Sequence, residues 1–257
     1  MNAALPPDVT VDALSGPWRI HQRRRGHRWS IDDLLTAHVA CLARPHARRA
    51  LDLGCGIGSV LMLCAYRLRE ASLVGVEAQE VSAALCRASL RLNGLTDRVE
   101  LRNFDFRDPA ALRPDEKFDL ITGTPPYLPV GTATMPADPQ RAACRIELRG
   151  GVEDYCRVAA DHLMDGGAVV LCSDGRRPER TRAAAREAGL TITGWLDLIP
   201  LPSKGPLFHV VTLERGEHPE PTVQRLLARD AEGRRTRELL AVRDAFDMPR
   251  MPGDDLG

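Results

Sequence analysis

Apolar and polar residues alternate along most of this chain with the spacing of buried strands separated by amphipathic helices. Short apolar runs predict strands near 49–53, 72–76, 99–104, 118–123, 168–172, 191–198 and 207–214. Between them, the pattern predicts helices near 31–43, 58–69, 80–92, 151–163 and 178–188. Strands that alternate with helices in this way indicate an α/β fold in which one doubly wound sheet carries helices on both faces.

Three segments lie outside this alternation. A cationic run occupies 21–28, and a loop with Gly131 and Pro139 follows the fourth strand, where we expect a mobile cover for a substrate. Near the C-terminus we expect a charged helix over 222–246, interrupted at Gly233. The expected organisation is an N-terminal extension with the basic run (1–28), a core domain (29–215) and a C-terminal helical or flexible tail (216–257).

Composition narrows the class of protein. With 257 residues and 44% hydrophobic content, the chain can bury one substantial core. It has no apolar run near the roughly 20 residues of a membrane span, and its start lacks the profile of a signal peptide. The seven cysteines are dispersed and include no Cys-x-x-Cys pair. We therefore expect a cytoplasmic protein with reduced thiols, no zinc site and no membrane association.

The charge is balanced overall but uneven locally. A net charge of zero argues against a general electrostatic binder of nucleic acid. The basic residues are almost all arginine throughout the chain, with lysine only at 117 and 204, so arginine content alone does not indicate RNA binding. The dense run at 21–28 is a more specific signal. It either contacts phosphates or forms a solvated loop.

Residues 50–58 carry the clearest chemical signal. They read Ala-Leu-Asp-Leu-Gly-Cys-Gly-Ile-Gly, an apolar strand ending beside Asp52 and then three alternate glycines before a helix. Glycine lets the backbone turn sharply and approach a ligand closely, and the helix that follows offers free N–H groups. The dinucleotide fingerprint would need a third glycine where Ser59 stands. The run therefore predicts a nucleotide-binding turn of another kind.

With glycines at 54, 56 and 58, this turn resembles motif I of class I S-adenosylmethionine (SAM) methyltransferases. Two acidic residues follow in the expected order. Glu77 ends the second strand about 20 residues later, where a carboxylate can accept hydrogen bonds from both ribose hydroxyls. Asp105 ends the third strand, and the resemblance implies that it accepts from the adenine amino group while Phe106 covers the ring.

Thr124-Pro125-Pro126-Tyr127 directly follows the fourth strand. It resembles the Asn-Pro-Pro-Tyr motif of methyltransferases that act on exocyclic amines of bases or on a glutamine amide. In that family, the Asn side chain and the first proline carbonyl hold the amine, and the aromatic ring stacks on the substrate. Two prolines fix φ and suit a rigid loop that presents carbonyl groups. Thr124 departs from the motif, because its hydroxyl accepts a hydrogen bond but reaches less far than Asn.

The segment before the first helix resembles bacterial tRNA adenine-N6 methyltransferases of the type that modifies a valine tRNA. Residues that match their pattern are Gly26, Arg28, Ser30, Asp32, Leu34 and Leu35, with His27 in the aromatic place. Ser30 is also a plausible N-cap, with Asp33 approximating a capping box. The resemblance implies that this segment folds over the methionine end of the cofactor.

The resemblance covers residues 18–214 and implies a Rossmann-like, seven-stranded, mostly parallel sheet of order 3-2-1-4-5-7-6 with strand 7 antiparallel. Residues 29–215 would form the SAM-dependent methyltransferase domain. The implied cofactor-binding residues are Arg28, Asp32, Asp52, Gly54, Gly56, Gly58, Glu77, Ala78, Asp105 and Phe106. The implied catalytic residues are Thr124, Pro125, Pro126 and Tyr127. The chemistry requires no metal, since the sulfonium of SAM supplies the leaving group.

Adenine N6 in tRNA or another structured RNA is the leading expected substrate. Two other enzymatic interpretations stay open, a glutamine-amide N5 methyltransferase acting on a protein and a small-molecule methyltransferase that tolerates Thr124. A SAM-binding protein that has lost catalysis is a further alternative from a different class.

Overall fold

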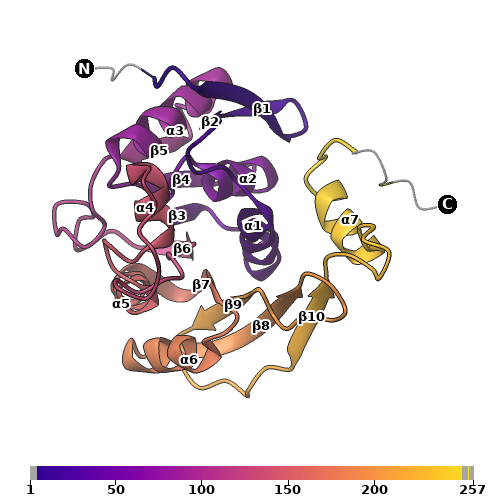
Figure 1. Cartoon of the computed structure of the whole chain (residues 1–257). Helices are drawn as coiled ribbons and strands as arrows, with labels where there is room; N and C mark the ends of the chain where they lie inside the picture. The colour runs from indigo at the N-terminus through magenta and orange to yellow at the C-terminus, as the bar shows by residue number, and fades with distance from the viewer. Residues whose placement is uncertain (1–4, 251–253, 255–257) are drawn as a thin grey trace.

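The structure, a computed structural model, describes residues 5–250 and residue 254 of the chain. Its centre is an eight-stranded, mostly parallel sheet with helices on both faces (Figure 1). In spatial order, its strands are β5 (Val99–Arg102), β4 (Ser72–Val76), β3 (Arg49–Leu53), β6 (Phe118–Gly123), β7 (Leu163–Asp174), β9 (Phe208–Glu214), β8 (Thr191–Ile199) and β10 (Val223–Leu227). A separate hairpin consists of β1 (Val9–Ser15) and β2 (Trp18–Arg23).

Both faces of the sheet are buried. The helices are α1 (Ile31–Ala43), α2 (Ser59–Arg67), α3 (Glu80–Leu92), α4 (Pro139–Arg145), α5 (Val152–His162), α6 (Pro178–Glu187) and α7 (Arg237–Asp244). Along β3, Ala50 belongs to the apolar cluster with α1, α2 and α3, whereas Leu51 and Leu53 belong to the cluster with α5 and α6. Alternate side chains of a strand point to opposite faces, which explains the continuous apolar runs in the sequence.

The sheet order confirms the Rossmann-like methyltransferase fold expected from the sequence. When the strands of this sheet other than β10 are numbered 1 to 7 along the chain, their order is 3-2-1-4-5-7-6. The seventh of them, β9, pairs antiparallel with both β7 and β8. An eighth strand, β10, was not expected. It pairs in parallel with β8 and extends the sheet by one strand.

The expected helix over 222–246 is wrong for its first half. Residues 223–227 form β10, because the edge of β8 offers backbone groups that pair with this segment. A turn then follows in which Gly233 has φ +81°, a conformation that interrupts a helix. The helix itself, α7, begins only after Thr236, whose hydroxyl caps it by accepting a hydrogen bond from the Leu239 N–H. Tertiary pairing thus overrides the local pattern.

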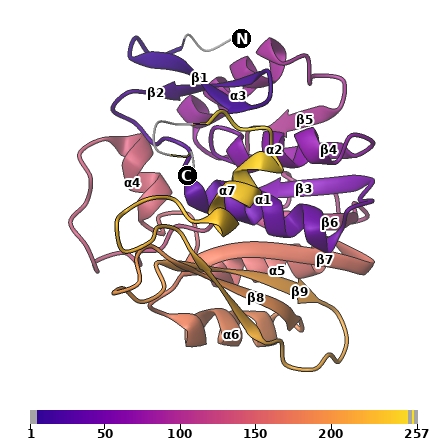
Figure 2. The same cartoon turned by 90° about the vertical axis from the view of Figure 1, so that its right-hand side faces the viewer.

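The tail packs against the N-terminal hairpin and α2 (Figure 2). The Ser15 hydroxyl donates to the Phe246 carbonyl at 2.5 Å, and the Tyr66 hydroxyl donates to Asp247 Oδ2 at 2.7 Å. The Phe246 side chain is 1% exposed and joins the core cluster. The segment up to residue 248 is therefore part of the folded core.

Truncation of Phe246 tests this packing. Phe246→Ala should lower the free energy of unfolding by roughly 3–5 kcal/mol, because a large buried ring is lost and a cavity remains. The measurement is urea unfolding followed by circular dichroism. Leu42→Ala is the control, since Leu42 is 66% exposed on α1 and its loss should change stability by no more than about 0.5 kcal/mol. Equal stability of the two variants would contradict the packed tail.

Candidate functional site

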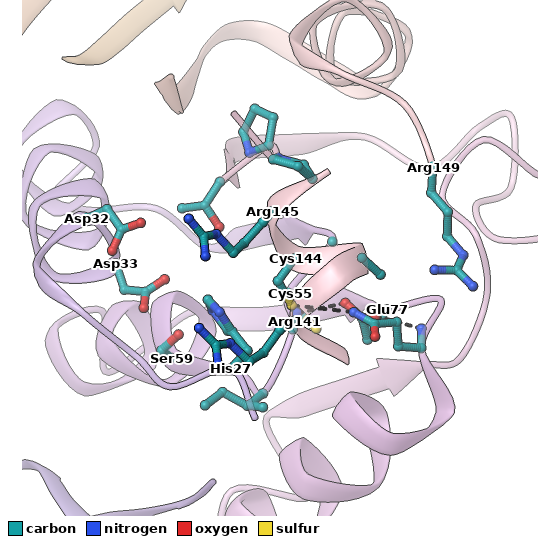
Figure 3. A pocket seen from close by; sticks show the side chains of 18 of the residues that line it. His27, Asp32, Asp33, Cys55, Ser59, Glu77, Arg141, Cys144, Arg145 and Arg149 are labelled. Carbon is teal, nitrogen blue, oxygen red and sulfur yellow. Dashed lines mark hydrogen bonds between the residues drawn. The ribbon is translucent and has the colours of Figure 1, made fainter. Parts of the chain in front are cut away.

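A cavity of about 680 Å³ opens at the carboxyl ends of the central strands (Figure 3). Ligands of doubly wound folds bind at this edge, and the volume is in the range of small-molecule sites. The cavity brings together most of the residues expected from the sequence. They are Arg28, Asp32, Gly54, Gly56, Glu77, Ala78, Asp105, Phe106, Thr124, Pro125, Pro126 and Tyr127. Asp52 and Gly58 do not line it.

The glycine turn after β3 has the backbone conformation that the sequence predicts. Gly54, Gly56 and Gly58 all have positive φ, between +57° and +86°. A Cβ at Gly54 would lie 2.2 Å from the Tyr155 hydroxyl, so this glycine is required for packing. A Cβ at Gly56 would meet no atom within 4 Å. Since Gly56 also lines the cavity, its missing side chain leaves room for a ligand against the backbone.

Glu77, directly after β4, holds this turn in place. Its side chain is 5% exposed, its Oε2 accepts a hydrogen bond from the Gly56 N–H at 2.8 Å, and its Oε1 accepts from the Gln79 N–H at 2.6 Å (Figure 3). Burial raises the pKa of the carboxyl, and the two backbone bonds oppose that effect. Each oxygen retains a lone pair, so the carboxylate can still accept from hydroxyls of a ligand in the cavity.

Asp52 lies behind the turn, 3% exposed at the end of β3. Its Oδ1 accepts a hydrogen bond from the Thr122 hydroxyl at 2.8 Å, whereas its Oδ2 has no partner among the described residues. Burial raises its pKa to about 7, opposed chiefly by the hydrogen bond from Thr122. This position connects β3 to β6, and it suits a bracing role rather than ligand contact.

Asp105 and Phe106 form the far end of the cavity. The Arg107 guanidinium donates a hydrogen bond to each oxygen of Asp105, at 2.9 and 2.7 Å, and this holds the pKa of that carboxyl below its usual value. The Phe106 ring packs edge-on against Tyr155 with a centroid distance of 4.5 Å. The pair therefore offers an ionised acceptor beside an apolar ring, with Ala78 on the neighbouring wall.

Thr124 to Tyr127 form the wall that follows β6. The Tyr127 hydroxyl donates to Asp32 Oδ2 at 3.2 Å and lies 3.0 Å from Cys172 Sγ, so the ring is held between α1 and β7. The Thr124 side chain and the Pro125 carbonyl make no hydrogen bond with any of the described residues. Both residues line the cavity, and neither acceptor has a hydrogen-bond partner among the described residues.

The segment before α1 lines part of the cavity. Asp33 accepts a hydrogen bond from the Ser30 N–H at 3.0 Å and completes the predicted capping box. Burial raises the pKa of Asp33 well above its usual value, and burial lowers that of His27. Arg28 turns toward the hairpin, where its guanidinium pairs with Asp12 at 3.2 Å.

The cavity is also lined by residues that the sequence did not suggest. Helix α4 occupies part of the stretch expected to be a mobile loop, and its Arg141, Cys144 and Arg145 line the cavity. The available signal was the Asp138-Pro139 pair, because the Asp138 carboxylate caps the Arg141 N–H at 3.0 Å and proline suits the first position of a helix. Pro139 was expected within the loop, whereas it is the first residue of α4.

Comparisons with known proteins agree with this geometry. Residues 30–137 match the family model described as "Methyltransferase small domain". Proteins named tRNA1(Val) (adenine(37)-N6)-methyltransferase from Yersinia pestis and Yersinia pseudotuberculosis are 29% identical over 211 residues, covering 78% of this chain and 78% of each relative.

Solved structures share the fold. A predicted O-methyltransferase from Agrobacterium tumefaciens superposes with a TM-score of 0.65 at 22% identity, covering 86% of this chain and all of that one. TYW2 from P. horikoshii, solved in complex with MeSAdo, superposes with a TM-score of 0.56 at 18% identity, covering 81% of this chain and 71% of that one.

The fold, the glycine turn and these matches define the class: the chain is a SAM-dependent methyltransferase of the class I fold. Within that class, it resembles the bacterial tRNA adenine-N6 methyltransferases. The cavity fits SAM as cofactor, because Gly56 leaves space beside the turn and Glu77 is held ready to accept hydrogen bonds. In the part of the chain that the structure describes, no group of three His, Cys, Asp or Glu is arranged to hold a metal ion, and no helix is long and apolar enough to span a membrane.

The space beside Gly56 yields a direct test. Gly56→Val should abolish the binding of SAM measured by calorimetry, because its side chain enters the cavity. Gly94→Val is the matched control, since Gly94 has a similar φ of +66°, equally open surroundings and a position outside the cavity. Both variants carry the same backbone strain, so only Gly56→Val should lose SAM. Loss of binding in both, or in neither, would contradict the assigned turn.

Proposed function

We propose that this enzyme transfers the methyl group of SAM to an exocyclic amino group, namely adenine N6 in tRNA or another structured RNA. The observation that carries this proposal is that Thr124 and Pro125, whose hydroxyl and carbonyl have no hydrogen-bond partner among the described residues, line the same cavity as the glycine turn. The names of the Yersinia relatives support adenine in tRNA as the acceptor. Cytoplasmic localisation accords with an RNA substrate and with seven free cysteines among the described residues.

The chain would hold the cofactor along the edge of the sheet. Bound SAM supplies a methyl group on a sulfonium, which needs no metal or covalent enzyme intermediate to activate it. Glu77 would take the ribose hydroxyls, and Asp105 would accept from the adenine amino group. The remaining proposed cofactor residues are Gly54, Gly56 and Gly58 in the turn, Asp52 behind it, Ala78 and Phe106 beside the adenine, and Arg28 and Asp32 at the methionine end.

The acceptor wall would make a poor nucleophile reactive. The lone pair of an exocyclic amine is delocalised into its ring, so the nitrogen attacks only after its N–H groups are oriented. Thr124 and the Pro125 carbonyl would accept from these N–H groups, while Pro126 keeps the loop rigid and the Tyr127 ring stacks on the base. The hydrogen bond from Tyr127 to Asp32 anchors the hydroxyl end of that ring. Catalysis would then rest mainly on alignment.

Transfer to a purified RNA tests this function. The enzyme is incubated with SAM and an unmodified valine tRNA transcript, and the digested nucleosides are analysed by mass spectrometry. We expect N6-methyladenosine at one position and none with an RNA in which that adenosine is replaced by guanosine. Parallel reactions with a bacterial protein extract and with a metabolite extract report the two competing acceptors. Methyl transfer only to protein or only to metabolites would contradict the proposal.

Thr124 tests how the amine is held. Thr124→Val keeps the shape and removes the hydroxyl, so the rate of methyl transfer should fall roughly 10- to 150-fold, equivalent to about 1.5–3 kcal/mol. Binding of SAM should persist, because Thr124 contacts the acceptor rather than the turn. Thr124→Asn restores the common family residue and should retain activity in the same nucleoside assay. A fully active Val variant together with an inactive Asn variant would mean that Thr124 shapes a pocket and holds no amine.

A further inference from the structure

Arginines that lack an internal partner gather around the cavity. The chain has balanced charge, and most of its arginines are occupied by carboxylates or backbone carbonyls. Arg24, Arg25, Arg141 and Arg145 are exposed, line the cavity and make no side-chain hydrogen bond or ion pair with the described residues. We call these four the arginine rim.

Two segments far apart in sequence are joined to build this rim. Arg24 and Arg25 follow β2, whereas Arg141 and Arg145 lie one helical turn apart on α4. Arg23 connects the segments, because its guanidinium pairs with Asp8 and with Asp138, the N-cap of α4, each at 2.9 Å.

Gln140 closes the same junction. This side chain is 1% exposed, its Oε1 accepts from the His27 N–H at 3.3 Å, and its Nε2 donates to the Ser82 hydroxyl at 3.1 Å. A Cβ at Gly26 would lie 2.2 Å from Gln140 Oε1, so the two segments approach as closely as a glycine permits. The rim is therefore one fixed surface rather than two independent loops.

This arrangement changes the role of the basic run. The simplest expectation is that every arginine of 23–28 can contact phosphate, but Arg23 is engaged by two carboxylates and Arg28 by Asp12. Arg23 acts as a positioning residue that orients its neighbours. Arg149 also lines the cavity, yet its charge opposes the raised pKa of Glu77 and contributes to the lowered pKa of Asp105, which associates it with these two carboxylates.

We propose that the arginine rim binds the phosphates on both sides of a single unpaired nucleotide whose base enters the cavity. This inference rests on the proposed function and adds the form of the substrate, a single-stranded segment of RNA. An exocyclic amine inside a duplex is paired and stacked, so the base must leave the stack to reach the cavity. Its flanking phosphates then remain at the mouth, where the rim lies. Figure 3 shows Arg141 and Arg145 extending from α4 toward the side of the cavity that carries His27, Asp32 and Asp33.

Four free guanidiniums suit phosphate chemically. Arginine stays charged at all relevant pH values and can donate two parallel hydrogen bonds to one phosphate. An acidic peptide could also meet such a surface, but the cavity that the rim borders is also lined by Tyr127, whose flat ring suits a base. We therefore commit to RNA and treat protein as an outcome of the test.

The test measures the salt dependence of binding. Fluorescein-labelled, unmodified valine tRNA transcript is titrated with the full chain in 50–300 mM KCl, with S-adenosylhomocysteine present, and fluorescence anisotropy is recorded. The variants are R24S/R25S and R141S/R145S. The matched control is R186S/R225S, because Arg186 and Arg225 are exposed, make no side-chain contact with the described residues and do not line the cavity.

Each rim pair should reduce the slope of log affinity against log salt by about 1.5, since each lost phosphate contact removes roughly 0.7–0.9. Affinity for the transcript at 100 mM KCl should fall at least about tenfold. The control should match the wild type, and calorimetry should find SAM affinity unchanged in all variants. A labelled duplex of the same length should bind more weakly than the transcript and should lose less affinity in the rim variants.

Three results would overturn the inference. The rim variants could bind RNA as the control does, or they could lose SAM while retaining RNA, which would assign these arginines to the cofactor. The rim variants could also retain RNA binding and lose methyl transfer to a protein substrate, which would assign these arginines to a protein acceptor. If the wild type methylates RNA and the rim variants bind RNA as the wild type does, the role of the arginine rim is refuted and the proposed function stands. A wild type that methylates no RNA refutes the proposed function first and the rim with it.

Discussion

The buried carboxylate of Glu77 is the contact on which this site depends. It joins the end of β4 to the turn after β3 by accepting the Gly56 N–H, and it joins the start of α3 by accepting the Gln79 N–H. Three glycines at alternate positions, all with positive φ, would otherwise leave that turn free to adopt many conformations. Burial of the carboxylate is costly, as its raised pKa indicates, and the two backbone bonds offset part of that cost. Glu77 also lines the cavity, so its remaining lone pairs are available to a ligand there.

Local sequence patterns were sufficient for the central sheet and for the residues at its edge. The predicted strands 49–53 and 72–76 and the predicted helices 31–43 and 80–92 have the observed bounds, because each is a buried run or an amphipathic repeat. The hairpin β1–β2 and strand β10 were missed. Their backbone pairing depends on partners distant in sequence or on the open edge of β8, which no local pattern encodes.

The candidate site likewise contains residues that local sequence patterns predict and residues that they do not. Residues at strand ends, such as Glu77 and Asp105, could be predicted because the ends of parallel strands meet at one edge. The contribution of α4 could not, since its position depends on the pairing of Arg23 with its N-cap Asp138 and on the contacts of its own Gln140 with His27 and Ser82. Part of the basic run, which was expected to contact phosphates, forms structural ion pairs instead, because Arg23 pairs with Asp138 and Arg28 with Asp12. Local patterns thus account for the residues at the strand ends, whereas long-range contacts position α4 and the basic run beside them.

The central claim is that the acceptor is an adenine amine of RNA. The most direct measurement is quantitative mass spectrometry of tRNA nucleosides and RNase fragments from a strain lacking this gene, its parent and a strain complemented with the wild-type gene. The account predicts that one fragment loses a methyl group on adenosine in the deletion strain and regains it on complementation. Identical N6-methyladenosine content and identical fragments in all three strains would contradict the account.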